Sequence, residues 1–189
     1  MRRIILEPDD CHLISNKRLL CWYYKSISME PHHYHVNIHW NSDRKGIMCS
    51  PELNSSLIEN GCIEVATPPQ FPKGIHGIWS PEHLFTAAVS SCFMTTFLAI
   101  AENSNLDFNA FDCGATGILE QVDGKFLMTE ILLKPVVILK EEKNRNLALR
   151  VLDRTEASCL ISNSIKSKIS IDPVIRINAE PYTSAKKIA

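Results

Sequence analysis

The sequence predicts an α+β fold, and three stretches carry this prediction. Residues Tyr34 to Trp40 alternate apolar and polar side chains, which is typical of a strand with one buried face. Residues 84–101 contain no charged side chain, as expected of a helix that is covered nearly all round. Two β-type runs, 110–121 and 126–139, flank the tight-turn sequence 122–125. We therefore expect sheet, and in part a second subunit, to cover the long helix.

The strands before the long helix are short. Residues 41–46 carry turn chemistry and end in Gly46, which is able to take positive φ, and residues 47–50 should return as a strand. Two further short strands, at 57–58 and 62–66, flank Asn60-Gly61, a strong hairpin signal.

Helix signals and prolines shape the rest of the chain. Ser80 as N-cap and Pro81 at the first helical position predict a helix to about residue 103. Pro135 predicts an edge or a bulge in its strand, and Pro173 predicts an edge in the last one. The remaining elements are a helix over 141–158, a second helix that ends soon after Cys159, and a final strand over 169–177.

The length of 189 residues is that of one domain with a short arm. Residues 1–31 show no sustained period, so we expect an N-terminal extension there, ordered or disordered, and a single domain over 32–189. The net charge of −1 shows no basic excess, which argues against nucleic acid as a partner. Five Ser and Thr residues dilute the uncharged stretch 84–101, so we expect a core helix and no membrane contact.

The seven cysteines form no C-x-x-C pair. This argues against a structural zinc site and against a thioredoxin-type motif, and the cysteine count is too low for a disulfide scaffold. A reducing, cytoplasmic location is therefore expected. Cys49 and Cys113 lie in strand-like runs and are expected to be inert. His35 and His39 are four residues apart on a strand, so they do not converge on a metal ion.

Two cysteines stand out by their context. Cys92 lies in the middle of the uncharged helix and Cys159 lies at a helix end. From the pattern alone, both are most simply buried small hydrophobic residues, which is the commonest fate of a free cysteine.

The residues around these cysteines resemble a known family. The segment 81–92 (PEHLFTAAVSSC) is similar to the first signature of the OsmC/Ohr family, the osmotically inducible and organic hydroperoxide resistance proteins, and the segment 159–164 (CLISNS) is similar to the second. The resemblance extends over about residues 33–178. The Pro-rich, aromatic loop 68–79 and Leu160 resemble the general OsmC-like subgroup rather than Ohr proper.

The resemblance implies a fold, an activity and a set of site residues. The fold has antiparallel sheets wrapped around a long buried central helix in an intertwined homodimer, with two active sites at the interface. The activity is that of a thiol-dependent peroxidase in oxidative-stress defence, with Cys92 as peroxidatic and Cys159 as resolving cysteine. The family's turn arginine matches Arg44 and its helix glutamate matches Glu82, which is otherwise a plain first-turn acid.

The chemistry agrees with these residue types. A thiolate attacks the peroxide, so the pKa of Cys92 must be lowered, and Cys92 lies too far along its helix for the helix dipole to do this. We expect Arg44 to supply the charge. The resulting sulfenic acid would condense with Cys159 to a disulfide, which an external dithiol or lipoyl-type reductant would reduce without a bound cofactor.

Glu82 raises a question of distance. Ten residues of helix span about 15 Å, so Glu82 cannot touch Cys92 of its own chain, and we expect it to act across a dimer. The choice between organic hydroperoxide and hydrogen peroxide stays open. The rival reading is a non-catalytic OsmC-like module that holds an apolar small ligand in the dimer cleft, and a metal-binding protein is the weakest alternative.

Overall fold

The computed structural model describes residues 31–53 and 61–178. All that follows concerns the unit Val36–Ala189. Most of the expected extension 1–31, and the expected strand at 57–58, lie outside the described residues.

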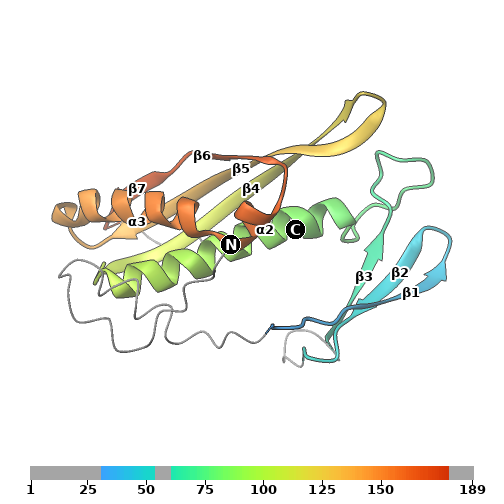
Figure 1. The fold of residues 1–189 in the computed structure, drawn as a ribbon, viewed down its shortest axis with the longest axis horizontal. Coiled ribbons are helices and arrows are strands. Elements are labelled where there is room, and N and C mark those ends of the chain that lie inside the picture. Colours follow the sequence, from blue (N-terminus) through green and yellow to red (C-terminus); the bar gives the residue numbers. More distant parts are fainter. Residues whose placement is uncertain (1–30, 54–60, 179–189) are drawn as a thin grey trace, which may run out of the picture. The chain divides into compact units, whose positions relative to one another are not determined.

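The architecture is α+β, as predicted (Figure 1). Its elements are β1 (Asn37–Ser42), β2 (Lys45–Cys49), β3 (Cys62–Ala66), α2 (Pro81–Asn103), β4 (Phe108–Val122), β5 (Lys125–Leu139), the 3₁₀ turn η2 (Glu142–Asn144), α3 (Arg145–Ser158), α4 (Leu160–Ser164), β6 (Lys168–Ile171) and β7 (Val174–Ile177).

The first sheet is antiparallel, in the order β1-β2-β3. Asp43, and not Gly46, takes the positive φ of its first turn, at 45°. Gly46 lies within β2, where a Cβ atom would stand 2.7 Å from the His39 carbonyl oxygen. Both faces of β1 are exposed in the described part of the chain: Ile38 is 60% and Trp40 77% exposed. The expected buried face of this strand is therefore absent from the single chain.

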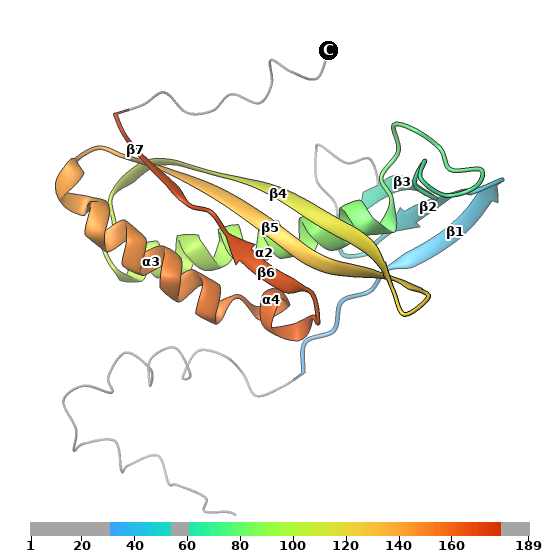
Figure 2. The same cartoon turned by 90° about the horizontal axis from the view of Figure 1, so that it is seen from above.

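The second sheet combines antiparallel and parallel strands. β4 and β5 form a long hairpin through Asp123 and Gly124, both at positive φ, as the turn sequence predicted. β6 and β7, however, pair parallel to β5, so the expectation of purely antiparallel sheets is wrong. The reason is the crossover through α3, because a parallel return needs a connection long enough to carry the chain back along the sheet. Figure 2 shows both short strands running beside β5.

Two prolines mark where β5 changes partner. β6 pairs with Glu130–Leu133 and β7 pairs with Val136–Leu139, so Pro135 falls in the gap between the two partners. Pro135 fits into β5 without a sheet edge or a bulge. Its missing N–H would point to the side of β6 and β7, where no strand is paired with this residue. The expected final strand is in turn divided in two at Asp172 and Pro173.

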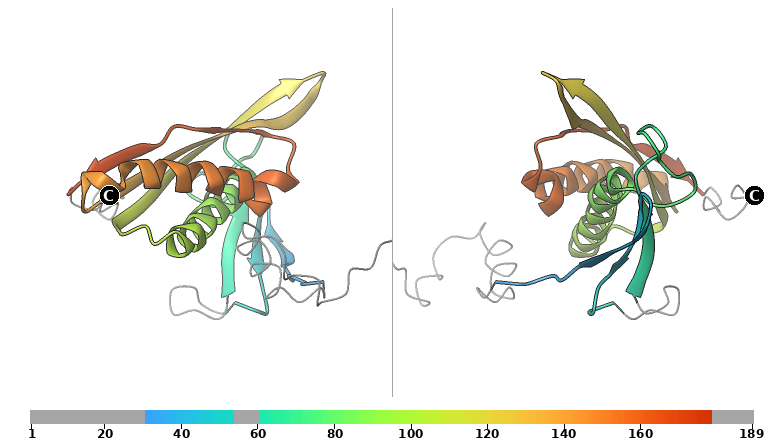
Figure 3. Two further views of the ribbon diagram at one scale, coloured as in Figure 1. Left: turned by 60° about the vertical axis from the view of Figure 1, so that its left-hand side comes forward. Right: turned by 90° about the vertical axis from the view of Figure 1, so that its right-hand side faces the viewer.

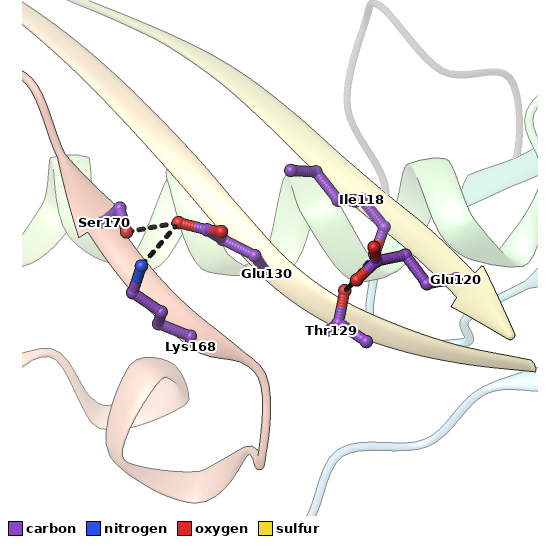
Figure 4. Close-up of polar contacts among 6 residues, drawn as sticks. All are labelled: Ile118, Glu120, Thr129, Glu130, Lys168 and Ser170. Atoms are coloured by element: carbon purple, nitrogen blue, oxygen red, sulfur yellow. Dashed lines mark hydrogen bonds and ion pairs between the residues drawn. The ribbon is translucent and has the colours of Figure 1, made fainter. Parts of the chain in front are cut away.

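Polar side chains reinforce the second sheet (Figure 4). The Glu130 carboxylate accepts hydrogen bonds from the Ser170 hydroxyl and, at 3.2 Å, from Lys168, which connects β5 to β6. These contacts, the Ser170 bond first, lower the pKa of Glu130. On the other side of β5, Thr129 donates to Glu120 of β4.

The helix α2 begins where its sequence predicts. Ser80 is the N-cap, with Pro81 in the first turn, and His83 completes a capping box by accepting from the Ser80 backbone N–H. The helix start predicted from Ser80 and Pro81 is thus confirmed.

One face of α2 forms the core with α3 and the second sheet. The two helices lie on the same face of that sheet (Figure 3). The Phe97 ring stacks on Phe111 with 4.4 Å between centroids and meets Phe108 edge-on at 5.3 Å. The fully buried residues of α2 are Val89, Phe93, Phe97 and Ala101.

The opposite face of α2 is uncovered in the single chain. Met94 is 39% and Leu98 43% exposed, so the helix is buried on one side only and not nearly all round. By length and composition alone α2 could cross a membrane. Its buried side, however, belongs to the hydrophobic core of the domain.

Candidate active site

The two cysteines singled out in the sequence lie together in the structure. Cys92 is half-buried in the middle of α2, and Cys159 is fully buried at the junction of α3 and α4. Cys159 ends α3 with an extended backbone, at φ −67° and ψ 112°. This kink brings the next residues over Cys92, so that the Ile161 N–H donates to the Cys92 sulfur at 3.4 Å.

Several hydrogen-bond donors converge on the Cys92 sulfur. Desolvation by burial raises its pKa and is the largest single effect, but four donors together outweigh it and lower the pKa of Cys92 below its ordinary value. The donors, in decreasing order, are the Ile161 N–H, the Cys159 thiol, the Thr96 hydroxyl and the Leu160 N–H. A thiolate is stabilised when donors face it, and thiolate is the nucleophilic form of cysteine.

The pKa of Cys159 moves in the opposite direction. Burial is the main cause of its rise, and the neighbouring Cys92 adds to it, against hydrogen bonds from Ser162 that lower it. The pair therefore divides its roles: Cys92 is the more readily ionised thiol, and Cys159 holds its proton more tightly and donates a hydrogen bond to the Cys92 sulfur.

Glu82 lies at the other end of the described site, in the first turn of α2. Its Oε2 atom is buried, yet no described residue donates a hydrogen bond to it. A buried carboxylate oxygen without a donor is costly, so this side chain needs a partner that the described residues do not supply.

Arg44 is exposed in the turn between β1 and β2. The Thr67 N–H fixes its backbone by donating to the Arg44 carbonyl oxygen at 3.0 Å. The adjacent Lys45 forms an ion pair with Glu64 at 3.0 Å, across the β2–β3 ladder. Of the two neighbouring cations, Arg44 is thus the one without an ion pair among the residues described.

Two cavities meet at Glu82. The larger, of about 920 Å³, is lined mainly by apolar and aromatic residues of the loop 68–79, α2 and the β4–β5 hairpin. The smaller, of about 470 Å³, has both Arg44 and Glu82 in its wall. Cys92 lines neither cavity.

The structure therefore divides the four predicted site residues into two pairs. Cys92 and Cys159 are in contact, and Arg44 and Glu82 share a cavity, but no described contact joins one pair to the other. Within 31–53 and 61–178, no cluster of three or more His, Cys, Asp or Glu residues could hold a metal ion.

Sequence reasoning missed the donors that act on Cys92. It assigned the lowering of the pKa to a cation, whereas in the single chain backbone N–H groups of residues 160 and 161 do this together with Thr96. Only Thr96 left a signal, because a residue four positions after Cys92 lies on the same side of a helix. The backbone donors depend on the kink at Cys159, which no side-chain pattern reveals.

A model of the OsmC-like protein family matches residues 74–174, more than half of the chain. The chain belongs to the OsmC-like protein family. The matched region contains α2, both cysteines of the contact pair and Glu82. Arg44 and the first sheet precede it.

The chain is also similar to individual proteins, one by sequence and others by fold. The uncharacterized protein YmaD of Bacillus subtilis is 25% identical over 149 residues, which are 76% of this chain and 93% of YmaD. An OsmC-like protein of unknown function from Vibrio cholerae has a similar structure, with a TM-score of 0.66, 20% identity and coverage of 76% of this chain and 100% of that one. An organic hydroperoxide resistance protein from Elizabethkingia anophelis follows with a TM-score of 0.60, 19% identity and coverage of 80% and 100%.

Proposed function

We propose that this OsmC-like protein is a thiol-dependent peroxidase that reduces hydroperoxides, with Cys92 as the peroxidatic and Cys159 as the resolving cysteine. One observation carries the proposal: the Cys159 thiol hydrogen-bonds the Cys92 sulfur, a contact that lowers the pKa of Cys92 and raises that of Cys159. A cysteine that served only as a hydrophobic residue would need no converging donors. The organic hydroperoxide resistance proteins among the structural relatives are consistent with this chemistry.

The reaction begins at the Cys92 thiolate. It attacks one oxygen of the O–O bond, the bond breaks, and the other oxygen leaves as an alkoxide that takes up a proton and departs as the alcohol. Cys92 becomes a sulfenic acid. The Cys159 sulfur then attacks the Cys92 sulfur, which releases water and forms a disulfide.

Reduction completes the cycle. An external reductant, either a small dithiol or a lipoyl-type group, reduces the Cys92–Cys159 disulfide by exchange and is itself oxidised, so no bound cofactor is required. The proposal places this cycle in the cytoplasm, as part of the defence against oxidative stress.

A homodimer would complete the site. About 15 Å of helix separates Glu82 from Cys92 within one chain, so the Arg44–Glu82 pair would serve the cysteine pair of a second subunit. The uncovered face of α2 supports such a partner because it carries no charge between residues 84 and 101. The partner would also cover the exposed Ile38 and Trp40 of β1 and supply what the buried Glu82 Oε2 lacks.

A second function is favoured by one observation. The larger cavity, of about 920 Å³, is wide enough for a small apolar ligand and includes Phe71, Trp79 and Phe126 in its lining. In the peroxidase such a lining would favour organic hydroperoxides over hydrogen peroxide. In the rival reading the protein holds an apolar ligand there without turnover.

The deciding experiment follows peroxide consumption and cysteine oxidation together. Reduced protein is mixed with cumene hydroperoxide or with hydrogen peroxide, dithiothreitol is the reductant, and peptide mass mapping locates the oxidised sulfur atoms. The wild type should turn over repeatedly. Cys92→Ser should consume no peroxide. Cys159→Ser, treated with peroxide in the absence of dithiothreitol, should complete roughly one turnover before Cys92 gains further oxygen atoms, whereas the wild type should stop at the disulfide.

The matched control is Cys113→Ser, which alters the other free cysteine in the described part of the chain and should leave turnover unchanged. If Cys92 of the wild type stays unmodified under excess peroxide, the peroxidase proposal is wrong. Binding of an apolar fluorescent probe without any peroxide consumption would then support the rival reading.

A further inference from the structure

A second pair of cysteines is joined at the edge of the first sheet. Cys49 ends β2 and Cys62 begins β3, and a disulfide connects them with 4.1 Å between their Cα atoms. The expectation that Cys49 is an inert thiol is therefore wrong. Register explains the pairing: the Ser50 N–H donates to the Gly61 carbonyl oxygen, so Cys49 and Cys62 form the adjacent non-hydrogen-bonded pair, whose side chains lie closest.

The sheet that carries this disulfide has almost no hydrophobic core. None of the residues in the buried core cluster of the domain belongs to β1, β2 or β3. Ala66 is the single fully buried apolar side chain in its described strands. Because apolar burial contributes so little here, the order of the sheet depends on its backbone ladder, on the Lys45–Glu64 ion pair and on the disulfide.

The disulfide and Arg44 lie at opposite ends of one short ladder. β2 and β3 pair in continuous register from Cys49–Cys62 to Lys45–Ala66, and the Thr67 N–H to Arg44 carbonyl bond extends the ladder by one step. Whatever loosens the disulfide end of the ladder therefore acts on the strand that positions Arg44 in the smaller cavity.

The cysteines of this pair are less enclosed than Cys159. Both Cys49 and Cys62 are half-buried, whereas Cys159 is fully buried. A small thiol needs only one exposed sulfur to begin exchange. Disulfides in reducing compartments are mostly transient, and the proposed cytoplasmic location would expose this pair to such thiols.

We propose that Cys49 and Cys62 form a second redox site, which exchanges electrons with small dithiols and whose oxidation state sets the rigidity of the β2–β3 ladder. In the step itself a thiolate of the dithiol attacks one sulfur of the disulfide and releases the other as thiolate, which takes up a proton. The second thiolate of the dithiol then resolves the mixed disulfide. Two electrons and two protons reduce the pair, and the dithiol leaves as its own disulfide.

The exchange is independent of the peroxidase chemistry, but its consequence at Arg44 rests on the proposed function. Oxidation holds Arg44 in a rigid ladder, and reduction loosens the ladder. The reaction of Cys92 with peroxide should accordingly be slower when the Cys49–Cys62 pair is reduced.

The first experiment tests the site without any peroxide. The full-length protein is equilibrated in buffers with graded ratios of reduced to oxidised dithiothreitol, and differential alkylation with peptide mass mapping reports the state of each cysteine. Hydrogen exchange of β2 and β3 is measured in the same samples. We expect the pair to open reversibly in the folded protein, with amide exchange in these strands at least tenfold faster, while exchange in α2 and α3 stays unchanged.

Three outcomes would overturn the proposal: thiols that never pair, a disulfide that opens only when the whole chain unfolds, or opening without faster exchange in the two strands. The double variant Cys49→Ser/Cys62→Ser should reproduce the exchange of the reduced state and should no longer respond to the buffer ratio. Cys113→Ser is the matched control and should behave as the wild type. Chemical reduction of the wild type keeps the test available if the double variant does not fold.

The second experiment measures the consequence at Cys92. Single-turnover peroxide reduction is compared between wild type and the double variant, both at a dithiothreitol ratio at which alkylation shows the Cys92–Cys159 pair reduced and, in the wild type, the Cys49–Cys62 disulfide still formed. We expect the double variant to react several-fold more slowly. If neither protein reacts, the peroxidase proposal fails while the exchange site stands or falls by the first experiment. Equal rates would overturn the connection to Arg44.

Discussion

The Ile161 N–H points at the Cys92 sulfur from 3.4 Å, across a contact between two segments far apart in the sequence. This bond and its neighbour from Leu160 both depend on the extended backbone of Cys159. The segment that carries the second cysteine therefore activates the first, before any disulfide forms. Residues 159–161 thus supply both the backbone donors that lower the pKa of Cys92 and the cysteine proposed to form a disulfide with it.

The Leu160 donor can be removed with little disturbance. Proline is tolerated at the first position of a helix, and the Cys159 backbone already has angles that suit a residue before proline. Leu160→Pro deletes one N–H that faces Cys92, so the pKa of Cys92 should rise. The measurement is the pH dependence of Cys92 alkylation. At pH 7 the rate should fall, by no more than roughly tenfold.

Leu160→Ala is the control for this change. The Leu160 side chain is 67% exposed, so its loss should cost little, and the backbone donor remains. An equal effect of both variants would mean that the side chain, and not the N–H, acts on Cys92.

Thr96 offers a test of the same mechanism within α2. Its hydroxyl hydrogen-bonds the Cys92 sulfur, whereas the hydroxyl of the adjacent Thr95 donates to the Cys92 carbonyl oxygen at 3.1 Å. Thr96→Val keeps the shape but removes the donor, so the midpoint of the pH–rate profile should move upward and the rate at pH 7 should fall several-fold. Thr95→Val should leave the profile unchanged. A shift with Thr95→Val alone would contradict the assignment.

Cys113 provides a pH-dependent contribution to stability. Burial, against a weaker hydrogen bond from the Lys134 backbone, raises its pKa to about 11. The unfolded chain loses this proton near pH 8.5, earlier than the folded chain does, so the folded state should lose stability as the pH rises from about 8.5 to about 11. Cys113→Ala should remove this loss. The difference between wild type and variant in unfolding free energy, measured with urea at pH 7.5 and pH 10, should change by roughly 1 kcal/mol. If this difference is the same at both pH values, Cys113 ionises as readily in the folded chain as in the unfolded chain.

The sequence predicted what depends on local chemistry. The start of α2 followed from Ser80 and Pro81, and the β4–β5 hairpin followed from Asp123 and Gly124, because caps and tight turns demand particular residue types. The contact between Cys92 and Cys159 followed from the family resemblance, since nothing in their spacing brings them together.

What the sequence did not predict depends on register and topology. Asn60-Gly61 indicates a local hairpin, in which the strand that begins at Cys62 pairs with residues 57–58 and not with β2, so the sequence does not predict the Cys49–Cys62 disulfide. The parallel strands β6 and β7 require the path of α3 across the sheet, which apolar periodicity does not encode.

The proposed homodimer can be tested on the uncovered face of α2. Leu98 is 43% exposed there, one helical turn after Met94, which is 39% exposed. Leu98→Glu would bury an unpaired charge in the subunit interface and should weaken dimerisation by at least tenfold, as measured by sedimentation at low micromolar concentration. Leu149→Glu, at a residue that is 41% exposed on α3, should leave assembly unchanged. A monomeric wild type would remove the role proposed for Glu82 across the interface.

Arg44, rather than Lys45, should set the remaining part of the reactivity of Cys92. Lys45 is held by Glu64 across the ladder, whereas Arg44 shares a cavity wall with Glu82, whose buried oxygen lacks a donor. A guanidinium can face a carboxylate and a thiolate at once, which a single ammonium does less well. In the proposed dimer Arg44→Ala should raise the pKa of Cys92 and slow its reaction with peroxide at pH 7 by roughly tenfold or more.

Lys45→Ala is the matched control, because it removes a cation from the adjacent position and should leave the reaction with peroxide within twofold of the wild type. The measurement is the pH dependence of Cys92 alkylation, with Cys159 as an internal reference that should stay slow because burial raises its pKa. Arg44→Lys separates charge from geometry. The rate at Cys92 should recover in part, relative to Arg44→Ala, if the charge matters. Full recovery would show that the planar guanidinium is unnecessary. If Lys45→Ala has the larger effect, the assignment of Arg44 to the site is wrong.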